Sequence, residues 1–213
     1  MEETSKIANY FDESACEFCD RYKNSGLSRS SKLLLDFVKE EEIHGKSILD
    51  LGCGAGSFSV EALKHGAGSA VGFDLSPKMV KAATDLAATD GFQDRAKFQQ
   101  GNVAMTELPT ADIVVMDKVI CCYSDAELLL KNAARASGST LGFVVPRDDG
   151  IFRWPFRAGV WVANLFQKGR DNVRFYLHPL NVVDKILRDC GFVRKKKQGS
   201  RLWLVFLYKR IDG

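Results

Sequence analysis

The sequence predicts an α/β fold: a doubly wound, mostly parallel seven-stranded sheet with helices on both faces and an antiparallel C-terminal strand. Three observations support this prediction. Short apolar runs alternate with amphipathic segments between residues 47 and 146. A glycine-rich turn, DLGCGAG, begins at Asp50, where the first of these runs ends. Two β-like runs close the chain with no helix between them, which predicts a hairpin at one edge of the sheet.

Each expected element follows from a local pattern. Apolar residues at helical spacing, from Leu33 to Val38, predict helix within the first 40 or so residues. Strands are expected at residues 47–51, 70–73, 97–100, 112–116 and 140–145. Helices are expected at residues 58–65, 77–88 and 125–136, the second with Ser76 as its N-cap and Pro77 at its first position. The hairpin is expected at residues 192–196 and 202–208, around Gln198-Gly199-Ser200.

The 213 residues fit a single domain with four parts, because no linker, repeat or low-complexity tract interrupts them. We expect an N-terminal helical cap (1–45), a ligand-binding core (46–146), a segment facing a second substrate (147–178), and a C-terminal helix with the hairpin (179–213).

Composition limits the function and the location. The net charge of +3 and pI near 8.5 are too mild to require a nucleic-acid partner. Of the six cysteines, Cys16 and Cys19 form one CxxC pair, but no second pair follows, so we expect reduced thiols and no metal. The polar N-terminus is no signal peptide, and no apolar run reaches the roughly 20 residues of a membrane span. These features predict a cytoplasmic protein.

The glycine turn has the spacing GxGxG, whereas dinucleotide folds use GxGxxG to receive a diphosphate. Asp50 stands two residues before the first glycine, and its charge would repel a diphosphate. Asp74 ends the second expected strand, where a carboxylate can accept hydrogen bonds from both hydroxyls of an unphosphorylated ribose. The pattern therefore favours a nucleoside with a cationic tail, and S-adenosylmethionine has both features.

ILDLGCGAGSFSVEAL followed by AVGFDLSPKMV resembles the first two motifs of the class I S-adenosylmethionine-dependent methyltransferases. These motifs cover residues 47–80, and the order of the elements extends the resemblance over residues 47–210. The resemblance implies a Rossmann-like methyltransferase fold, methyl transfer as the activity, and S-adenosyl-L-methionine as the cofactor.

The resemblance also implies roles for individual residues. The turn of Gly52, Cys53, Gly54 and Gly56 would lie against the methionine part of the cofactor. Asp50 would hold its ammonium and Asp74 its ribose, and Leu75 and Met79 would pack on the adenine. Asn102-Val103 would meet the adenine edge, with Asn102 in place of the family's frequent Asp. Asp117 and Lys118 would line the methionine. Met79 fits a core position equally well, Asp117 a turn cap, and Lys118 a solvated surface position.

The acceptor is less constrained, because one fold serves many acceptors. The segment DKVICCY, beginning at Asp117, lacks the prolines of enzymes that methylate base amines, and no Pro-Cys nucleophile occurs. YFDESACEFCDRY, DKVICCYSD and RFYLHPLNVVDKILRDCGF resemble, more weakly, the magnesium-protoporphyrin IX methyltransferases and related small-molecule O-methyltransferases. That resemblance implies O-methylation of a carboxylate or hydroxyl on an apolar or aromatic acceptor. The alternatives are an RNA or protein methyltransferase and a non-catalytic cofactor-binding module.

Aromatic and basic residues alternate over residues 152–176, including Trp154, Trp161 and Phe175. An amphipathic helix covering the sheet explains this pattern; the alternative is a lid whose aromatics grip an acceptor bearing acidic groups. Tyr10 and His178 are the candidate catalytic residues, acting as a base or an anchor. The alternative for His178, just before Pro179, is a structural histidine or helix cap. The sequence does not indicate an oligomeric state.

Overall fold

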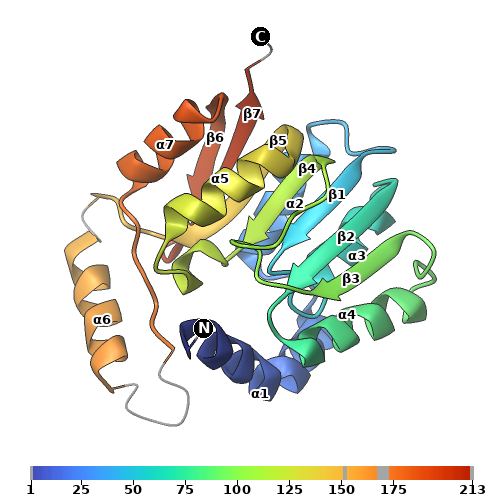
Figure 1. Ribbon diagram of the computed structural model, residues 1–213, viewed down its shortest axis with the longest axis horizontal. Helices are drawn as coiled ribbons and strands as arrows, with labels where there is room; N and C mark the ends of the chain where they lie inside the picture. Colours follow the sequence, from blue (N-terminus) through green and yellow to red (C-terminus); the bar gives the residue numbers. More distant parts are fainter. Residues whose placement is uncertain (1, 151–152, 167–172, 212–213) are drawn as a thin grey trace.

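The computed structural model describes residues 2–150, 153–166 and 173–211. One seven-stranded sheet runs through it in the order β3-β2-β1-β4-β5-β7-β6 (Figure 1). The strands are β1 (Ser47–Leu51), β2 (Ser69–Asp74), β3 (Ala96–Gln100), β4 (Ala111–Asp117), β5 (Ser137–Pro146), β6 (Phe192–Gly199) and β7 (Trp203–Arg210). Strands β1 to β5 pair in parallel, and β7 is antiparallel to both of its neighbours, β5 and β6. The predicted fold class is confirmed.

The helices follow the expected alternation with the strands. They are α1 (Glu2–Ser25), α2 (Arg29–Lys39), α3 (Ser57–Lys64), α4 (Pro77–Thr89), α5 (Ala126–Ala136), α6 (Arg153–Phe166) and α7 (Leu180–Asp189), with a 3-10 turn, η1 (Ile120–Cys122). Ser76 caps α4 as predicted, because its hydroxyl accepts the Met79 N–H at 3.0 Å. Strand β5 begins three residues before its expected start, and β6 extends three residues beyond its expected end.

Alternate residues of each central strand face opposite layers of the core. Leu49 and Val114 pack among α5 and α7, whereas Ile48 and Ile113 pack among α2 and α3. All four side chains are almost fully buried, as expected for strands covered on both faces. Asp50 lies between apolar neighbours in this pattern, so its burial needs a functional explanation.

Helices α1 and α2 lie within the first 39 residues of the chain, ahead of β1. Helix α2 packs on the sheet, and α1 crosses the carboxyl ends of the strands next to α4 (Figure 1). Asp12 on α1 accepts hydrogen bonds from the Ser76 hydroxyl and from the Lys78 N–H at the start of α4. The N-terminal helix is therefore joined directly to the turn that follows β2.

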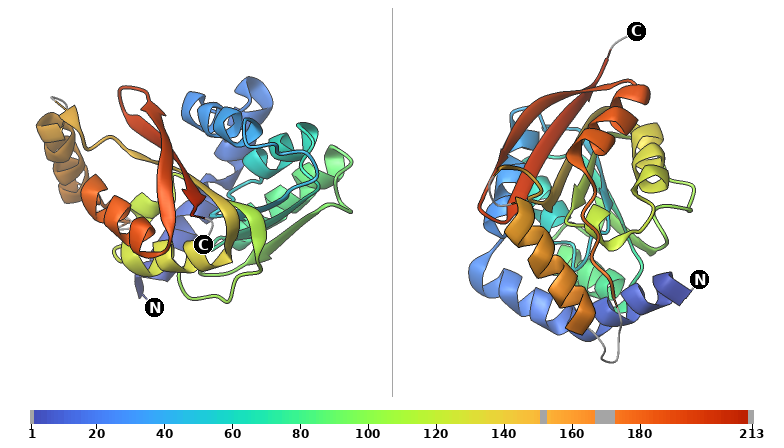
Figure 2. Two further views of the ribbon diagram at one scale, coloured as in Figure 1. Left: turned by 90° about the horizontal axis from the view of Figure 1, so that it is seen from above. Right: turned by 90° about the vertical axis from the view of Figure 1, so that its left-hand side faces the viewer.

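Helix α6 lies to one side of the sheet and covers neither face, so the interpretation as a sheet-covering helix is wrong (Figures 1 and 2). The chain then returns through an extended segment, residues 173–179, to α7. Residues 151–152 and 167–172 of the predicted lid lie outside the described residues. No helix in the described parts of the chain is long and apolar enough to cross a membrane.

Candidate functional site

A cavity of about 320 Å³ lies where β1, β2 and β4 end, with α1 forming part of its wall. The order of the strands reverses between β1 and β4, and parallel α/β sheets bind ligands at such a point. Ten residues predicted for cofactor binding line it: Asp50, Gly52, Cys53, Gly54, Asp74, Leu75, Met79, Val103, Asp117 and Lys118. The motifs are thus brought together on one surface, while the individual cofactor contacts stay predictions.

The glycine turn runs directly under this cavity. Gly52 has a φ of 71°, and its N–H donates to the Phe73 carbonyl at 2.7 Å, joining the turn to β2. A Cβ at Gly52 would lie 2.5 Å from a Val119 methyl, so the backbone packs too closely for any other residue. A Cβ at Gly54 would meet nothing within 4 Å, which leaves that backbone open to a ligand. Gly56, the third glycine, does not line the cavity and instead packs against Ala83 of α4.

Asp74 anchors the turn from the end of β2. Its two carboxylate oxygens accept the backbone N–H groups of Gly54 and Ser76, each at 2.9 Å. Burial raises the pKa of Asp74, and these two hydrogen bonds oppose the rise. Each oxygen retains a further acceptor position, so the carboxylate can bind ligand hydroxyls without releasing the backbone.

Asp50 is buried at the end of β1 with 1% of its surface exposed. The Ser59 hydroxyl of α3 donates to it at 2.7 Å. Burial raises the pKa of Asp50 from 3.8 to about 7; the carboxylates of Asp117 and Asp74 add to the rise and Ser59 opposes it. A cation in the cavity would stabilise the charged form, so the residue suits a positively charged ligand.

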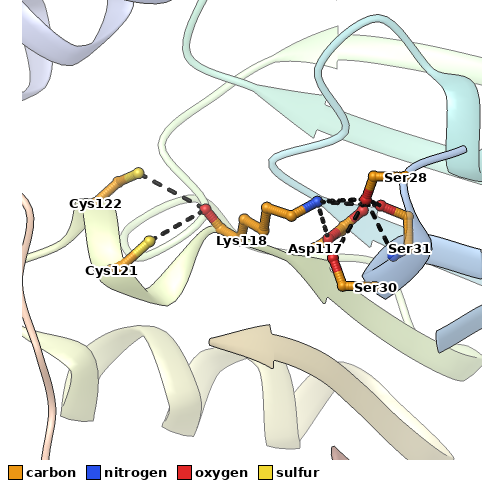
Figure 3. A network of polar contacts seen from close by, with 7 residues as sticks. All are labelled: Ser28, Ser30, Ser31, Asp117, Lys118, Cys121 and Cys122. Atoms are coloured by element: carbon orange, nitrogen blue, oxygen red, sulfur yellow. Dashed lines mark hydrogen bonds and ion pairs between the residues drawn. The ribbon is translucent and has the colours of Figure 1, made fainter. Parts of the chain in front are cut away.

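Asp117 ends β4, Lys118 follows it, and both line the cavity. The Lys118 side chain extends to the start of α2, where its Nζ donates to the hydroxyls of Ser28 and Ser31 at 3.0 and 3.1 Å (Figure 3). It also lies 3.2 Å from Oδ1 of Asp117 and 5.5 Å from the centroid of the Trp203 ring. The ammonium therefore has partners, and the interpretation of Lys118 as a solvated surface residue is wrong.

The backbone and the carboxylate at this position are also unusual. Lys118 has a φ of 64°, a left-handed conformation that non-glycine residues rarely adopt. Oδ1 of Asp117 is buried and accepts no hydrogen bond from the described residues, despite the nearby ammonium. This oxygen has the Lys118 ammonium nearby but no hydrogen-bond donor among the described residues, so Asp117 offers an acceptor to a ligand donor.

Only some of the residues predicted to contact the adenine line the cavity. Leu75 is half-buried, Met79 is fully buried, and both line the cavity, as does Val103. Asn102 does not line it, because its side-chain oxygen accepts the Ala104 N–H at 3.1 Å in the local turn. The adenine contact of Asn102 therefore stays a prediction that this geometry does not support.

The two candidate catalytic residues have different surroundings. Tyr10 lines the cavity, with its ring edge-on to Phe11 at 5.2 Å between centroids. His178 does not line the cavity; its Nε2 lies 2.9 Å from the Tyr123 carbonyl oxygen, and its ring stacks on Tyr176. The structure thus favours the structural role for His178 over the catalytic one.

The three cysteines beside the cavity are buried thiols. Cys121 and Cys122 both direct their S–H groups at the Lys118 carbonyl oxygen, at 3.5 and 3.8 Å (Figure 3). The adjacent Cys121 thiol and burial raise the pKa of Cys122 well above its usual range, and burial does the same for Cys53. Neutral thiols are poor nucleophiles, so these buried cysteines are suited to packing in the core. Nowhere in the described chain do three His, Cys, Asp or Glu side chains gather as they would around a metal.

Several cavity residues were missed by sequence reasoning. Phe18, Arg21 and Tyr22 contribute from α1, and Trp203 from the start of β7. Helical spacing could have shown which residues of α1 share a face, but no local signal places Trp203 near the glycine turn. Of the aromatic segment, Phe175 lines the cavity, whereas Trp154 and Trp161 are 77% and 66% exposed and do not.

A family model described as a methyltransferase domain matches residues 43–184, about two thirds of the chain. The match spans the glycine turn, Asp50, Asp74, Asp117 and Lys118, so it includes every polar residue described above at the floor of the cavity.

Curated relatives include ribosomal protein L11 methyltransferases. The protein from Pectobacterium carotovorum is 28% identical over 129 residues, which are 60% of this chain and 43% of the relative. The protein from Yersinia pseudotuberculosis is 33% identical over 118 residues, which are 55% of this chain and 40% of the relative. The chain thus matches less than half the length of these relatives.

Solved structures agree over more of the chain. Magnesium protoporphyrin IX methyltransferase from Synechocystis, solved with bound SAH, superposes with a TM-score of 0.76 at 19% identity, covering 96% of this chain and 98% of that one. An O-methyltransferase family protein from Burkholderia thailandensis gives a TM-score of 0.70 at 18% identity, covering 92% of this chain and 60% of that one. At these identities the likeness shows the fold alone.

Proposed function

The chain belongs to the methyltransferase domain family as a class I S-adenosylmethionine-dependent enzyme, and from this premise we propose that it methylates an oxygen atom of a small apolar or aromatic acceptor. The observation that carries the proposal is the wall of the cavity. Aromatic side chains of α1, β7 and the extended segment line it together with the polar floor at the strand ends.

The residues at the floor fit the cofactor. Asp74 has free acceptor positions for the ribose hydroxyls, and the backbone at Gly54 is open. The buried carboxylate of Asp50 and the half-buried carboxylate of Asp117 suit the ammonium and sulfonium charges, and Oδ1 of Asp117 accepts no hydrogen bond from the described residues. When bound, S-adenosylmethionine supplies an electrophilic methyl group. The residues of the chain bind and orient it.

The acceptor would occupy the part of the cavity bounded by the aromatic side chains. Tyr10, Phe11 and Phe18 contribute from α1, and Phe175 and Trp203 face the same cavity. Such surfaces suit a flat apolar body. Arg21 and Lys118 are the cations among the described lining residues, and they suit an acidic group on that body.

This arrangement needs little further chemistry if the acceptor is a carboxylate. A carboxylate is already ionised at neutral pH, so the protein needs to hold it in line with the methyl group and exclude water. A hydroxyl acceptor must also lose a proton, and we propose Tyr10, which lines the cavity, as the residue that accepts a hydrogen bond from this hydroxyl and orients it.

The test begins with titration calorimetry, using S-adenosylmethionine and its demethylated product. Methyl-labelled cofactor is then offered with a panel of planar aromatic carboxylic acids and phenols. We expect label in the small molecule, released by mild base when the product is an ester. Tight cofactor binding without transfer to any acceptor would instead support a non-catalytic module.

Ribosomal protein L11 and total RNA belong in the same assay, because the curated relatives described above are L11 methyltransferases. Label in protein or RNA, with none in the small molecules, would overturn the proposed acceptor class while leaving the family intact. RNA methylation would also decline steeply as salt rises, whereas activity on a small apolar acceptor would not.

A further inference from the structure

The left-handed backbone of Lys118 is held by contacts on both of its sides. Its N–H donates to the Val144 carbonyl oxygen at 3.2 Å, and the thiols of Cys121 and Cys122 both approach its own carbonyl oxygen. A non-glycine residue in this conformation costs free energy, and such outliers cluster at ligand-binding sites. The fold thus keeps a lysine where glycine would fit without strain, so the lysine side chain needs a functional explanation.

The Lys118 ammonium keeps one proton for a ligand. Two of its three protons donate to the hydroxyls of Ser28 and Ser31 (Figure 3), and the third forms no hydrogen bond with the described residues. The two hydroxyls lie 2.7 Å apart, because Ser28 caps α2 and Ser31 follows it by three residues. All three residues line the cavity, so the remaining proton is available there.

Asp117 has the complementary deficit beside this ammonium. Its Oδ1 lies 3.2 Å from Nζ of Lys118 but accepts no hydrogen bond from the described residues. A donor and an acceptor that do not satisfy each other therefore stand next to each other at the end of β4. A ligand satisfies both at once if it carries an ammonium and a carboxylate on the same carbon, as an α-amino acid does.

The methionine part of the cofactor is such an α-amino acid, and its carboxylate needs a positive partner. Asp50 and Asp74 give the rest of the cavity floor a negative charge, which repels a carboxylate. Arg21, the other cation among the described lining residues, has a side chain that is 55% exposed and already donates to Glu17 on the same helix. The Lys118 side chain is only 28% exposed, so water screens its charge less.

We propose that Lys118, oriented by Ser28 and Ser31, binds the α-carboxylate of S-adenosylmethionine. Asp117 accepts a hydrogen bond from the ammonium on the same carbon. The start of α2 adds a favourable positive potential, because no acidic residue occupies its first turn. The proposal rests on the cofactor and is independent of the acceptor class, and it leaves Arg21 as the cation for an acidic group of the acceptor.

The test is titration calorimetry of the full chain with S-adenosylmethionine and with decarboxylated S-adenosylmethionine. Both ligands have the sulfonium and the ammonium, and only the first has the carboxylate. We expect the unchanged protein to bind the decarboxylated ligand at least about tenfold more weakly, because charge-assisted hydrogen bonds are lost. Lys118→Met should weaken binding of S-adenosylmethionine by a similar factor and change binding of the decarboxylated ligand by less than about twofold, so the preference disappears.

Three further variants separate this role from loss of structure. Lys118→Gly also removes the ammonium, and glycine adopts a φ of 64° without strain, so this variant should stay folded and lose the same preference. Asp117→Asn should weaken both ligands alike, because both have the ammonium. Lys81→Met is the matched control, since this lysine on α4 is exposed, pairs with Asp85 and does not line the cavity. It should change neither affinity.

Equal affinity of the unchanged protein for the two ligands would overturn the proposal. An equal loss for both ligands in the Lys118 variants would also overturn it, and would make Lys118 a structural tie between β4 and α2. Loss of the preference in Arg21→Met alone would assign the carboxylate to α1 instead. A raised KM for carboxylic acid acceptors in Lys118→Met, with unchanged cofactor binding, would assign Lys118 to the acceptor. Methyl transfer is measured separately, so the proposed function can fail while this subsite stands.

Discussion

Replacing Asp50 with Asn should make the ligand-free protein more stable at alkaline pH. Asp50 is fully buried, and burial raises its pKa to about 7 in the folded protein, against 3.8 when exposed. Between these values the folded chain holds a proton that the unfolded chain has released. The free energy of unfolding therefore falls as pH rises through this window and levels off above pH 7.

The size of the effect follows from the two pKa values. Each unit of difference between the two pKa values corresponds to about 1.4 kcal/mol. The folded protein therefore loses about 4 kcal/mol of unfolding free energy in total once the pH is above 7. At about pH 5.5 roughly half of this loss has already occurred, so between about pH 5.5 and about pH 8.5 the remaining change is about 2 kcal/mol. The Asp50→Asn variant has no proton to lose, so its stability should change about 2 kcal/mol less over that interval.

The assay is denaturant unfolding at both pH values for the two proteins without cofactor. Comparing the change between pH values cancels any constant effect of the amide on packing. Asp112→Asn is the matched control, since this carboxylate lies at the opposite end of the sheet and its hydrogen bonds with Ser47 lower its pKa. That variant should follow the unchanged protein between about pH 5.5 and about pH 8.5. Parallel stability curves for Asp50→Asn and the unchanged protein would refute the reasoning.

The same substitution should reduce cofactor binding by at least about tenfold at pH 7, because a neutral amide cannot compensate a cationic ligand. In the unchanged protein, affinity should rise about tenfold between about pH 5.5 and pH 7 as Asp50 ionises. Calorimetry at the two pH values measures this change, and in Asp50→Asn it should be absent. An unchanged affinity in that variant would remove Asp50 from the binding site.

Three further predictions concern the turn and the cap. Asp74→Ala should weaken cofactor binding by about 1–3 kcal/mol in calorimetry, through the lost ribose hydrogen bonds; unchanged affinity would exclude that role. Gly52→Ala should destabilise the protein by about 1–3 kcal/mol in denaturant unfolding, because its Cβ would clash with Val119; adding Val119→Ala should restore part of this, and no restoration would exclude the clash. Asp12→Ala should make α1 more sensitive to limited proteolysis and cost about 1 kcal/mol, because Ser76 loses its partner; an unchanged digestion pattern would contradict that contact.

The core and the cavity floor could be predicted because their signals are local. Strand periodicity, the glycine turn and the carboxylates at the strand ends lie within one or two elements of each other. Asp50 and Asp74 were found from charge and spacing alone, and both line the cavity. The hydrogen bond from the Gly54 N–H to Asp74 joins the two motifs, a contact that the sequence did not predict.

The walls of the cavity could not be predicted, because they depend on contacts between residues that are far apart in the sequence. Asp12 reaches Ser76 across 64 residues, and Lys118 reaches Ser28 across 90. Helix α6 is held by the ion pair between Arg157 and Asp148 and by the hydrogen bonds between Asn164 and the Phe175 backbone, and no periodicity indicates these contacts. A helix rich in apolar residues is expected to pack on the core, so the hydrophobic pattern of α6 wrongly predicts that this helix covers the sheet.

The carboxylates explain why the site is unfavourable until it is filled. Asp50, Asp74 and Asp117 face one cavity, and the pKa of Asp50 is raised by burial and further by the charges of the other two. Lys118 compensates them only in part, because its single ammonium is shared among Ser28, Ser31 and Oδ1 of Asp117, and that oxygen accepts no hydrogen bond from the described residues. A cationic ligand supplies the missing charge and the missing donor together. After methyl transfer the cofactor product lacks the sulfonium charge, so the same carboxylates should favour the methylated cofactor over its product, which promotes product release.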